Sequence, residues 1–251
     1  MTASPDHAGL ALFGVFYGIY AWVVGIACVL AAILGTLVLP GLLRRRHWVS
    51  ACARAIFRLA GIRVVVRGME KLPDGHCIVV ANHASYLDGV VAQGFLPARF
   101  SYVIKSEVRR WPLIGFFLRR IDAKFVERFD ASGSARDARQ LLSAASAGES
   151  LAFFPEGTFV PEAGLDRFRA GAFAAAIKGC LPIVPLVISG SRQIWRGGTI
   201  LPRHGDLRLD FMNPIEPGHP AFENNKTLAD AARQSILEVL DEPDLLVDSR
   251  D

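Results

Sequence analysis

Cysteine is scarce in this chain, and its spacing matches neither a disulfide framework nor a metal site. The 251 residues contain only four cysteines, Cys28, Cys52, Cys77 and Cys180. No two of them are close in sequence, and His76 and His83 do not have the spacing of zinc ligands. We therefore expect small buried thiols in a reducing compartment and no bound metal ion.

Features typical of several other protein classes are also missing. The chain has no internal repeat and no low-complexity linker. Aromatic residues do not alternate with basic ones as they would on a base-stacking surface, so we expect no nucleic acid partner. No Gly-X-Ser-X-Gly turn is present, and without it a lipase or thioesterase would lack its usual serine nucleophile.

Charged residues are absent from a long stretch near the N-terminus. Residues 9–43 include no Asp, Glu, Lys, Arg or His, whereas a helix that crosses the bilayer core needs only about 20 apolar residues. The residues before this run lack the positive charge of a signal peptide. We expect a retained hydrophobic membrane anchor. It is either one spanning helix or, because glycines and Pro40 interrupt the run, two shorter helices that enter one leaflet.

Basic residues follow the uncharged run directly. By the positive-inside tendency, the three arginines at positions 44–46 predict that the following domain lies on the cytoplasmic side. In residues 47–59, polar and apolar side chains recur at helical spacing, which predicts an amphipathic helix. This helix either lies along the lipid surface or packs on the following domain. We assign residues 1–60 to the anchor and this helix.

Charge is distributed unevenly along the chain. Residues 1–130 carry 16 Lys+Arg against 8 Asp+Glu, a net charge of +8, and residues 131–251 carry 12 against 16, a net charge of −4. The first half is therefore expected to face an anionic surface, either a membrane or a phosphorylated substrate. The mean hydropathy of +0.31 favours a globular domain attached to a membrane over a polytopic membrane protein.

The rest of the chain, residues 61–251, alternates between short apolar strands and helices. Strands are predicted at residues 62–67, 77–81, 100–104, 125–126, 151–154, 183–188 and 207–212. Helices are predicted at residues 85–96, 109–120, 134–147, 170–178 and 227–240. This alternation predicts one α/β domain, and Pro185 within its strand predicts an edge strand or a bulge.

A histidine and an aspartate follow the strand predicted at residues 77–81. His83 lies where this strand gives way to a helix that Ser85 can cap, and Asp88 lies one turn further on. If the chain turns at once after His83, a carboxylate–imidazole hydrogen bond would fix the tautomer of the ring and raise its basicity, as a general base requires. Alternatively, His83 only caps the turn, and Asp88 occupies a position that the helix dipole favours.

A second turn follows another apolar strand. Pro155, Glu156, Gly157 and Thr158 come directly after the strand predicted at residues 151–154. A glycine and a small hydroxyl there let the backbone approach a ligand closely, and backbone N–H groups can hold an anion. In isolation, the tetrapeptide favours a plain tight turn.

Taken together, the motifs resemble those of the glycerolipid acyltransferase family, which makes phosphatidic acid. Asn82-His83 with Asp88 is followed, about seventy residues later, by Phe154-Pro155-Glu156-Gly157-Thr158, and each motif ends an apolar strand. Weaker agreement comes from Lys105 with Pro112 and Gly115, and from residues 125–128, 168–173 and 183–186. The resemblance covers roughly residues 62–188.

The resemblance implies both a fold and a reaction. The fold is a single acyltransferase domain, residues 61–251, with a mixed β-sheet flanked by helices and preceded by the membrane anchor. The reaction is transfer of a fatty acyl group from acyl-CoA or acyl carrier protein to the free hydroxyl of a lysophospholipid such as 1-acylglycerol 3-phosphate. No cofactor is implied.

The resemblance also implies residue roles. His83 would take the proton from the attacking hydroxyl while Asp88 orients the ring, and backbone amides near Gly157 would stabilise the oxyanion. Cations and the second turn would bind the glycerol phosphate. The residues expected to bind substrate are Lys105, Arg128, Glu156, Gly157, Thr158 and Arg169.

Two positions depart from the family pattern. Phe159 replaces the arginine or serine usual after Glu-Gly-Thr, and Asp122 replaces a glycine, which adds negative charge where the phosphate is expected. Two alternatives therefore stay open beside transfer to 1-acylglycerol 3-phosphate. One is a different acceptor, such as another lysophospholipid or a lyso-aminolipid, and the other is a non-catalytic membrane protein that binds lipid.

Replacing Arg128 tests the predicted phosphate contact. Arg128→Ala is expected to raise the KM for lysophosphatidic acid by about 10- to 150-fold, because hydrogen bonds to charged groups contribute about 1.5–3 kcal/mol. Steady-state kinetics at fixed acyl-CoA measures the change. An unchanged KM would instead favour a different lysolipid acceptor.

Overall fold

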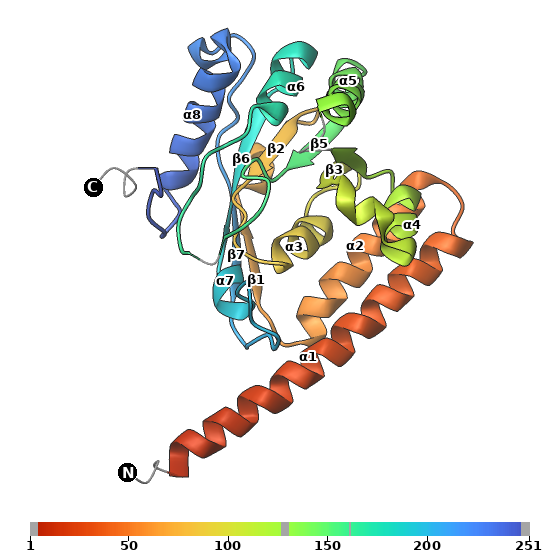
Figure 1. Cartoon of the computed structure of the whole chain (residues 1–251), viewed down its shortest axis with the longest axis vertical. Coiled ribbons are helices and arrows are strands. Elements are labelled where there is room, and N and C mark those ends of the chain that lie inside the picture. Colours follow the sequence, from red (N-terminus) through yellow and green to blue (C-terminus); the bar gives the residue numbers. More distant parts are fainter. Residues whose placement is uncertain (1–4, 127–130, 161, 247–251) are drawn as a thin grey trace.

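The computed structural model describes residues 5–126, 131–160 and 162–246. A seven-stranded sheet with helices on both faces forms the body of the molecule, and a long helical hairpin crosses one side of it (Figure 1). The strands are β1 (Val64–Arg67), β2 (Ile78–Ala81), β3 (Phe100–Lys105), β4 (Lys124–Val126), β5 (Ser150–Phe153), β6 (Ile183–Ser189) and β7 (Leu207–Phe211). The α-helices are α1 (Pro5–Val38), α2 (Leu42–Leu59), α3 (Leu87–Phe95), α4 (Pro112–Arg120), α5 (Ala131–Ser146), α6 (Gly171–Gly179), α7 (Ser191–Ile194) and α8 (Asn225–Leu237). Short 3₁₀ helices span Met69–Lys71, Ser106–Arg110 and Pro220–Glu223.

The sheet is mixed, as expected, and its strand order is β1-β7-β6-β2-β5-β3-β4. Strands β2 to β6 are parallel to one another, whereas β7 runs antiparallel to β6 and is paired in parallel with β1. Neighbouring strands β2 and β5 are in register, with Val80 opposite Phe153. Since parallel strands end at the same edge of a sheet, the segments that follow β2 and β5 emerge side by side.

The central strands are continuous apolar runs because helices cover both of their faces. All four residues of β2 and of β5 are buried. Helices α5, α6 and α8 pack on one face around Phe173 and Leu228, and α2 and α3 pack on the other around Phe57 and Val91 (Figure 1). The rigid sheet therefore holds the ends of β2 and β5 in a fixed position.

Pro185 lies in a central strand rather than at an edge, and the expected bulge explains how the sheet accommodates it. Bridges join β6 to the antiparallel segment at Ile183–Ile215 and at Leu186–Phe211. Two residues of β6 thus face three residues of the partner segment. The interruption removes the need for an N–H from Pro185, whose carbonyl accepts the N–H of Met212 at 2.9 Å.

The hydrophobic N-terminal run forms one continuous helix, α1, and not two shorter ones. The chain then reverses, and α2 packs back along the second half of α1 (Figure 1). The hydroxyls of Tyr17 and Tyr20 donate to the carbonyls at the end of α2, at 3.0 and 2.9 Å. Gly35 is required at the close approach of the two helices, because a Cβ there would lie 2.0 Å from the indole of Trp48.

Helix α2 packs on the domain, which is one of the two placements that its amphipathic pattern left open. The guanidinium of Arg46 is buried at 5% exposure and donates to the carbonyl of Ile121 at 2.9 Å and to the hydroxyl of Ser101 at 2.5 Å. Arg54 donates to the carbonyl of Gly94 on α3 at 2.7 Å. Arg46 of the basic triplet is therefore buried in the protein, where it joins α2 to the domain, and does not face lipid headgroups.

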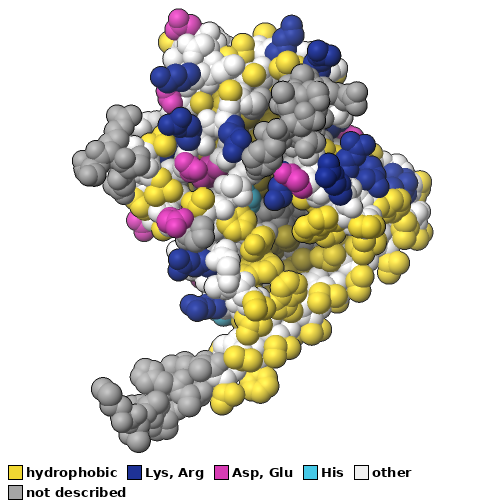
Figure 2. Space-filling view, in the orientation of Figure 1, with side chains coloured by type: hydrophobic (Ala, Val, Ile, Leu, Met, Phe, Trp, Pro, Cys, Tyr) yellow, Lys and Arg dark blue, Asp and Glu magenta, His cyan; other side chains and the backbone are white. Residues whose placement is uncertain are grey.

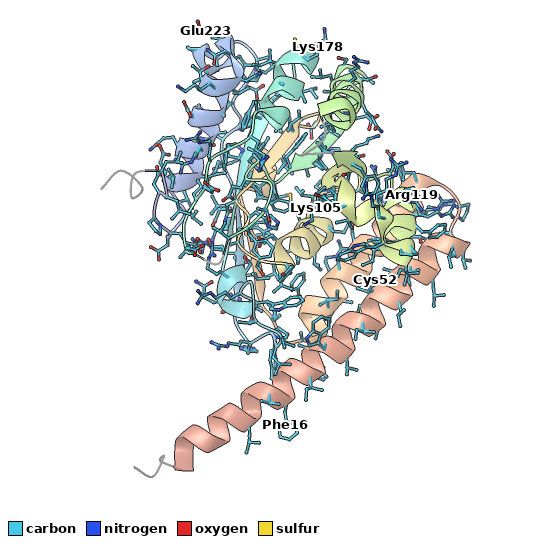
Figure 3. The ribbon with its side chains drawn as sticks, in the orientation of Figure 1. Phe16, Cys52, Lys105, Arg119, Lys178 and Glu223 are labelled. Atoms are coloured by element: carbon cyan, nitrogen blue, oxygen red, sulfur yellow. The ribbon has the colours of Figure 1, made fainter. Side chains whose placement is uncertain are left out.

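From Leu12 onward, the outward side of α1 is apolar. Large apolar side chains from Leu12 to Val38 are exposed there and form a yellow ridge in Figure 2. Among them is Phe16, which points away from the domain (Figure 3). By length and composition, Leu12–Val38 is long and apolar enough to cross a bilayer. The opposite side of the same helix packs on the domain through Val24, Ala32 and Ile33.

A side-chain amide fastens the end of β2 to β6. Asn82, which is 2% exposed, donates from Nδ2 to the carbonyl of Ile188 at 2.9 Å and accepts the N–H of Ile188 at 2.7 Å. The amide thereby extends the strand pairing by one step, directly before His83. This explains why an asparagine stands at the point where the chain must leave the sheet.

Removing this amide is expected to destabilise the protein. Asn82→Ala leaves a buried donor and a buried acceptor on Ile188 unpaired, which costs about 2–4 kcal/mol. Denaturant titration of the purified protein measures the loss. Gln234→Ala, at an exposed position of α8, is the control and should change the free energy of unfolding by no more than about 0.5 kcal/mol. Equal stabilities of the two variants would contradict the assignment.

Candidate active site

The carboxylate of Asp88 organises the loop that carries His83. Its Oδ2 atom accepts the N–H groups of Ala84 and Ser85 at 2.6 and 2.7 Å, and it lies 2.9 Å from Nδ1 of His83. The Asp88 side chain is fully buried. Two backbone donors make the chain turn immediately after His83, so the predicted contact between His83 and Asp88 is present in the structure.

The first turn of α3 is fixed by Ser85. Its hydroxyl accepts the N–H of Leu87 at 3.1 Å and donates to the carbonyl of Trp195 at 2.6 Å. The N-cap position of α3 falls on Tyr86 and not on Ser85 as expected, but Ser85 still accepts the first N–H of the helix and also ties the His83 loop to a distant segment. Helix α3 then begins at Leu87 and presents Asp88 in its first turn, facing back toward His83.

The His83 ring lies between aromatic side chains. Phe154 stacks on it with the ring centroids 4.5 Å apart, and Phe159 meets it edge-on at 4.9 Å. An ionised Asp88 accepts a hydrogen bond from Nδ1–H of a neutral ring, and this tautomer leaves the lone pair of Nε2 available. Within the described residues Nε2 has no hydrogen-bond partner, and the imidazole borders a cavity. The ring is therefore oriented for proton abstraction from a group in that cavity.

Glu156 supports His83 from the neighbouring strand end. Its Oε1 accepts the backbone N–H of His83 at 2.6 Å, and its Oε2 accepts the N–H of Asp166 at 3.0 Å. Burial raises the pKa of Glu156 to about 7, against the lowering effect of these two N–H groups. Both carboxylate oxygens are thus used within the protein. This places Glu156 as a positioning residue beneath the site, whereas a contact with substrate was expected.

The turn after β5 does not present the N–H of Gly157 to an oxyanion, although backbone amides near Gly157 were expected to stabilise one. Gly157 has a φ of 85° in the left-handed region that favours glycine, and its N–H donates to the carbonyl of Phe154 at 2.9 Å. That amide closes the turn and is not available to a ligand. Gly157 and the exposed Thr158 both line the cavity.

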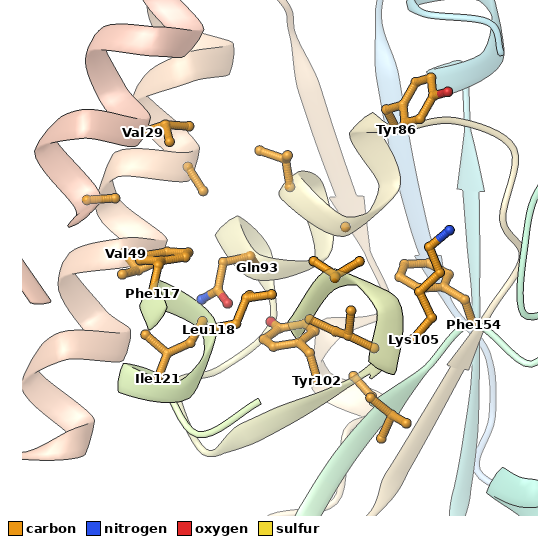
Figure 4. A pocket seen from close by; sticks show the side chains of 18 of the residues that line it. Val29, Val49, Tyr86, Gln93, Tyr102, Lys105, Phe117, Leu118, Ile121 and Phe154 are labelled. Atoms are coloured by element: carbon orange, nitrogen blue, oxygen red, sulfur yellow. The ribbon is translucent and has the colours of Figure 1, made fainter. Parts of the chain in front are cut away.

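The predicted phosphate-binding cations have different positions. Lys105, at the end of β3, is exposed and lines the cavity near Phe154 (Figure 4). Arg169 is exposed and donates from Nε to the carbonyl of Glu156 at 3.3 Å, but it does not line this cavity. Arg128 lies outside the described residues, so its role stays a prediction.

The cavity beside His83 has a volume of about 440 Å³ and is mostly apolar. It extends from the His83 ring along α3 and β3 to a wall formed by α1, α2 and α4 (Figure 4). The residues of this far wall are Cys28, Val29, Ala32, Val49, Cys52, Ala53, Ile56, Phe117, Leu118 and Ile121. No local sequence pattern indicated this cavity, because its walls come from segments that are distant along the chain.

Metal ligation has no support in the described ranges. No group of three or more His, Cys, Asp or Glu side chains is close enough there to hold a metal ion. The described site consists of a histidine with a buried carboxylate behind it, at the mouth of an apolar cavity.

Comparison with known proteins identifies the family. The sequence profile of the Acyltransferase family matches residues 63–189, which is half of the chain and includes both strand-end motifs. The chain belongs to the acyltransferase family.

Curated relatives of this acyltransferase carry names of one kind. A chloroplastic 1-acyl-sn-glycerol-3-phosphate acyltransferase of Brassica napus is 29% identical over 76% of this chain and 55% of the relative. One from Arabidopsis thaliana is 27% identical over 92% of this chain and 65% of the relative. One from Pseudomonas aeruginosa is 30% identical over 55% of this chain and 53% of the relative. The chain thus spans between about half and two thirds of the length of these relatives.

The fold of this acyltransferase also has a solved counterpart. The crystal structure of the 1-acyl-sn-glycerophosphate (LPA) acyltransferase PlsC from Thermotoga maritima superposes with a TM-score of 0.76 at 22% identity. The match covers 91% of this chain and 95% of the other, so it includes at least part of the helical hairpin as well as the sheet.

The structure accounts for both departures from the family pattern. Asp122 has a φ of 59°, the left-handed region where glycine is usual, and its carboxylate lies 3.4 Å from the Arg46 guanidinium and 3.1 Å from the Lys124 ammonium. Its charge is therefore balanced by these two cations. Phe159, at the position of an expected phosphate contact, instead forms an aromatic wall against His83 and Tyr86.

Asp88→Asn tests whether the carboxylate acts through the ring of His83. An amide oxygen at this position can still accept the N–H groups of Ala84 and Ser85, but the side chain no longer stabilises an imidazolium. We expect kcat to fall by about 10³- to 10⁴-fold, as when the histidine of such a pair adopts the wrong tautomer. Asp166→Asn is the control and should keep kcat within about twofold of the wild type, since its carboxylate only accepts a local N–H. A comparable loss in both variants would exclude this role.

Proposed function

We propose that this acyltransferase moves a fatty acyl group from a thioester, acyl-CoA or acyl carrier protein, to the free hydroxyl of 1-acylglycerol 3-phosphate and so forms phosphatidic acid. The observation that carries the proposal is the His83–Asp88 pair at the mouth of an apolar cavity. The names of the curated relatives support the same acceptor.

In the proposed reaction, His83 acts as the base. Nε2 takes the proton from the acceptor hydroxyl while the hydroxyl oxygen attacks the thioester carbonyl carbon, and Asp88 stabilises the imidazolium that forms. The tetrahedral intermediate then collapses, the carbon–sulfur bond breaks, and the thiolate takes the proton back from Nε2. No covalent acyl-enzyme is formed, and the proton returns to the leaving group.

The shape of the cavity supports the assignment of a fatty acyl chain. A volume of about 440 Å³ with mostly apolar walls lies in the usual range for ligand sites of about 300–1,000 Å³. We propose that the acyl chain fills the space toward α1, α2 and α4 while its thioester stays beside His83. Lys105 then faces the polar end of the substrates, and phosphate binding by Arg128 and Arg169 stays a prediction.

Membrane attachment is part of the proposal. One side of α1 packs lengthwise on the domain, so lipid cannot surround this helix on all sides. We propose that its apolar outward side lies in one leaflet, together with exposed Trp111, Leu113 and Ile114 around α4. The catalytic domain would then lie on the cytoplasmic face, in keeping with the basic first half of the chain.

An acceptor screen with labelled acyl-CoA tests the proposed reaction. Wild type is expected to acylate lysophosphatidic acid, and His83→Ala is expected to lose about 10²- to 10⁴-fold in rate. His76→Ala, at the opposite end of β2, should keep the wild-type rate and serves as the control.

Each competing function gives a different result in the same screen. A preference for lysophosphatidylcholine or a lyso-aminolipid would identify a different acceptor. Acyl release that does not depend on an acceptor would indicate hydrolysis. Wild-type protein without turnover on any thioester would indicate a non-catalytic lipid-binding protein.

A further inference from the structure

A second hollow lies outside the catalytic cavity, in the segment that follows β6. Its volume is about 280 Å³, and three arginines line it together with Thr199 and Leu201. These arginines are Arg192, Arg196 and Arg203. None of them has a role in the proposed reaction, so the cluster of positive charge requires another explanation.

The three arginines differ in their partners. Arg192 is held by Glu242, with Nε 3.0 Å from one carboxylate oxygen, and donates to the carbonyl of Val160 at 2.9 Å. Arg196 and Arg203 are exposed, and in the part of the chain that the structure describes neither guanidinium forms an ion pair or a hydrogen bond. Two guanidinium groups thus face the hollow with their hydrogen-bonding capacity unused.

The hollow is adjacent to the apolar side of α1. Trp22 donates from its indole to the carbonyl of Ile200 at 2.9 Å and meets the ring of Trp195 at 5.2 Å. Leu201 lies directly over Gly18 of α1. Ile200 is 80% exposed at the same place, where Figure 2 shows Lys and Arg side chains beside the yellow ridge of α1. Cationic and lipid-facing surfaces therefore meet here.

We propose that this Arg196–Arg203 pocket binds the phosphate of an anionic membrane lipid. The planar guanidinium fork matches phosphate oxygens, and two unpaired forks can share one phosphate. Ile200 and the outward side chains of α1 would contact the acyl chains of the same lipid. The inference rests on the membrane contact proposed above, but it does not depend on the reaction.

The position of the pocket would set the depth of the enzyme in the bilayer. Trp195, which directly precedes Arg196, contacts Tyr86, and its carbonyl accepts the hydroxyl of Ser85 in the catalytic loop. A phosphate held at Arg196 would therefore keep the mouth of the catalytic cavity close to the headgroup layer, where a lysolipid hydroxyl lies.

Vesicle flotation of the full-length protein tests this site. The probes are vesicles of phosphatidylcholine with and without phosphatidylglycerol. The double variant Arg196→Gln/Arg203→Gln is expected to lose about 30-fold in partitioning to the anionic vesicles, which corresponds to roughly fivefold for each basic side chain at such a surface. Binding to pure phosphatidylcholine should not change, because α1 is intact.

Two further variants separate a defined site from general charge. Lys178→Gln/Lys226→Gln removes the same charge from helices α6 and α8, remote from Phe16 of α1 (Figure 3), and should partition like the wild type. Arg196→Lys/Arg203→Lys keeps the charge but removes the forks and should lose at least fivefold. Either of two results would overturn the proposal. One is wild-type partitioning of Arg196→Lys/Arg203→Lys, and the other is a loss in Lys178→Gln/Lys226→Gln as large as that in Arg196→Gln/Arg203→Gln.

Soluble anions identify the source of the phosphate. At equal ionic strength, inorganic phosphate should displace the protein from anionic vesicles no better than chloride does. Selective displacement by inorganic phosphate would show that the pocket takes free phosphate, and it would overturn the lipid assignment. His83→Ala should float like the wild type, so failure of the proposed reaction would leave this result unchanged.

Discussion

The buried carboxylate of Asp88 is the group on which the site depends. A desolvated charge is costly unless hydrogen bonds compensate it, and Oδ2 obtains that compensation from two backbone N–H groups and the ring of His83. The same bonds bend the chain after His83 and orient its imidazole. Glu156 reaches the backbone N–H of His83 from β5. Two buried acidic residues, one from each neighbouring strand end, thus hold one histidine in position.

The N-terminal hairpin is part of the binding site as well as an attachment. Helices α1 and α2 supply one wall of the apolar cavity, and the buried Arg46 joins α2 to the segment around Asp122 at the far edge of the sheet. Removing the hairpin would therefore open the cavity to solvent. The apolar surfaces proposed to meet lipid and those proposed to meet an acyl chain are opposite sides of the same helices.

Sequence patterns predicted most of the fold because burial imposes them. Continuous apolar runs indicated the central strands, and helical spacing indicated the helices that cover them. Local pattern left two points open, and the structure decided both. Pro185 lies in a central strand at the expected bulge, because the partner strand is interrupted opposite it. The N-terminal run forms one helix as far as Val38, and α2 packs against Gly35 near the end of that helix.

The candidate site was predicted less completely. The spacing of His83 and Asp88 indicated their contact, since only an immediate turn can join them. No sequence pattern indicated that backbone N–H groups would donate to both carboxylate oxygens of Glu156. None indicated that the amide of Gly157 would close a turn. Such assignments depend on which backbone groups from other segments come within hydrogen-bond distance.

By itself, the sequence determined the order of the strands and of the longer helices, the apolar N-terminal helix and the candidate catalytic pair, because these follow from local periodicity and side-chain type. Only the tertiary structure decided what surrounds them. It brought α1, α2, α4 and β3 together around one cavity and set Phe159 against His83. It also directed the charge of Asp122 toward Arg46 and Lys124. The physical reason is that cavities and ion pairs form between segments that are far apart along the chain.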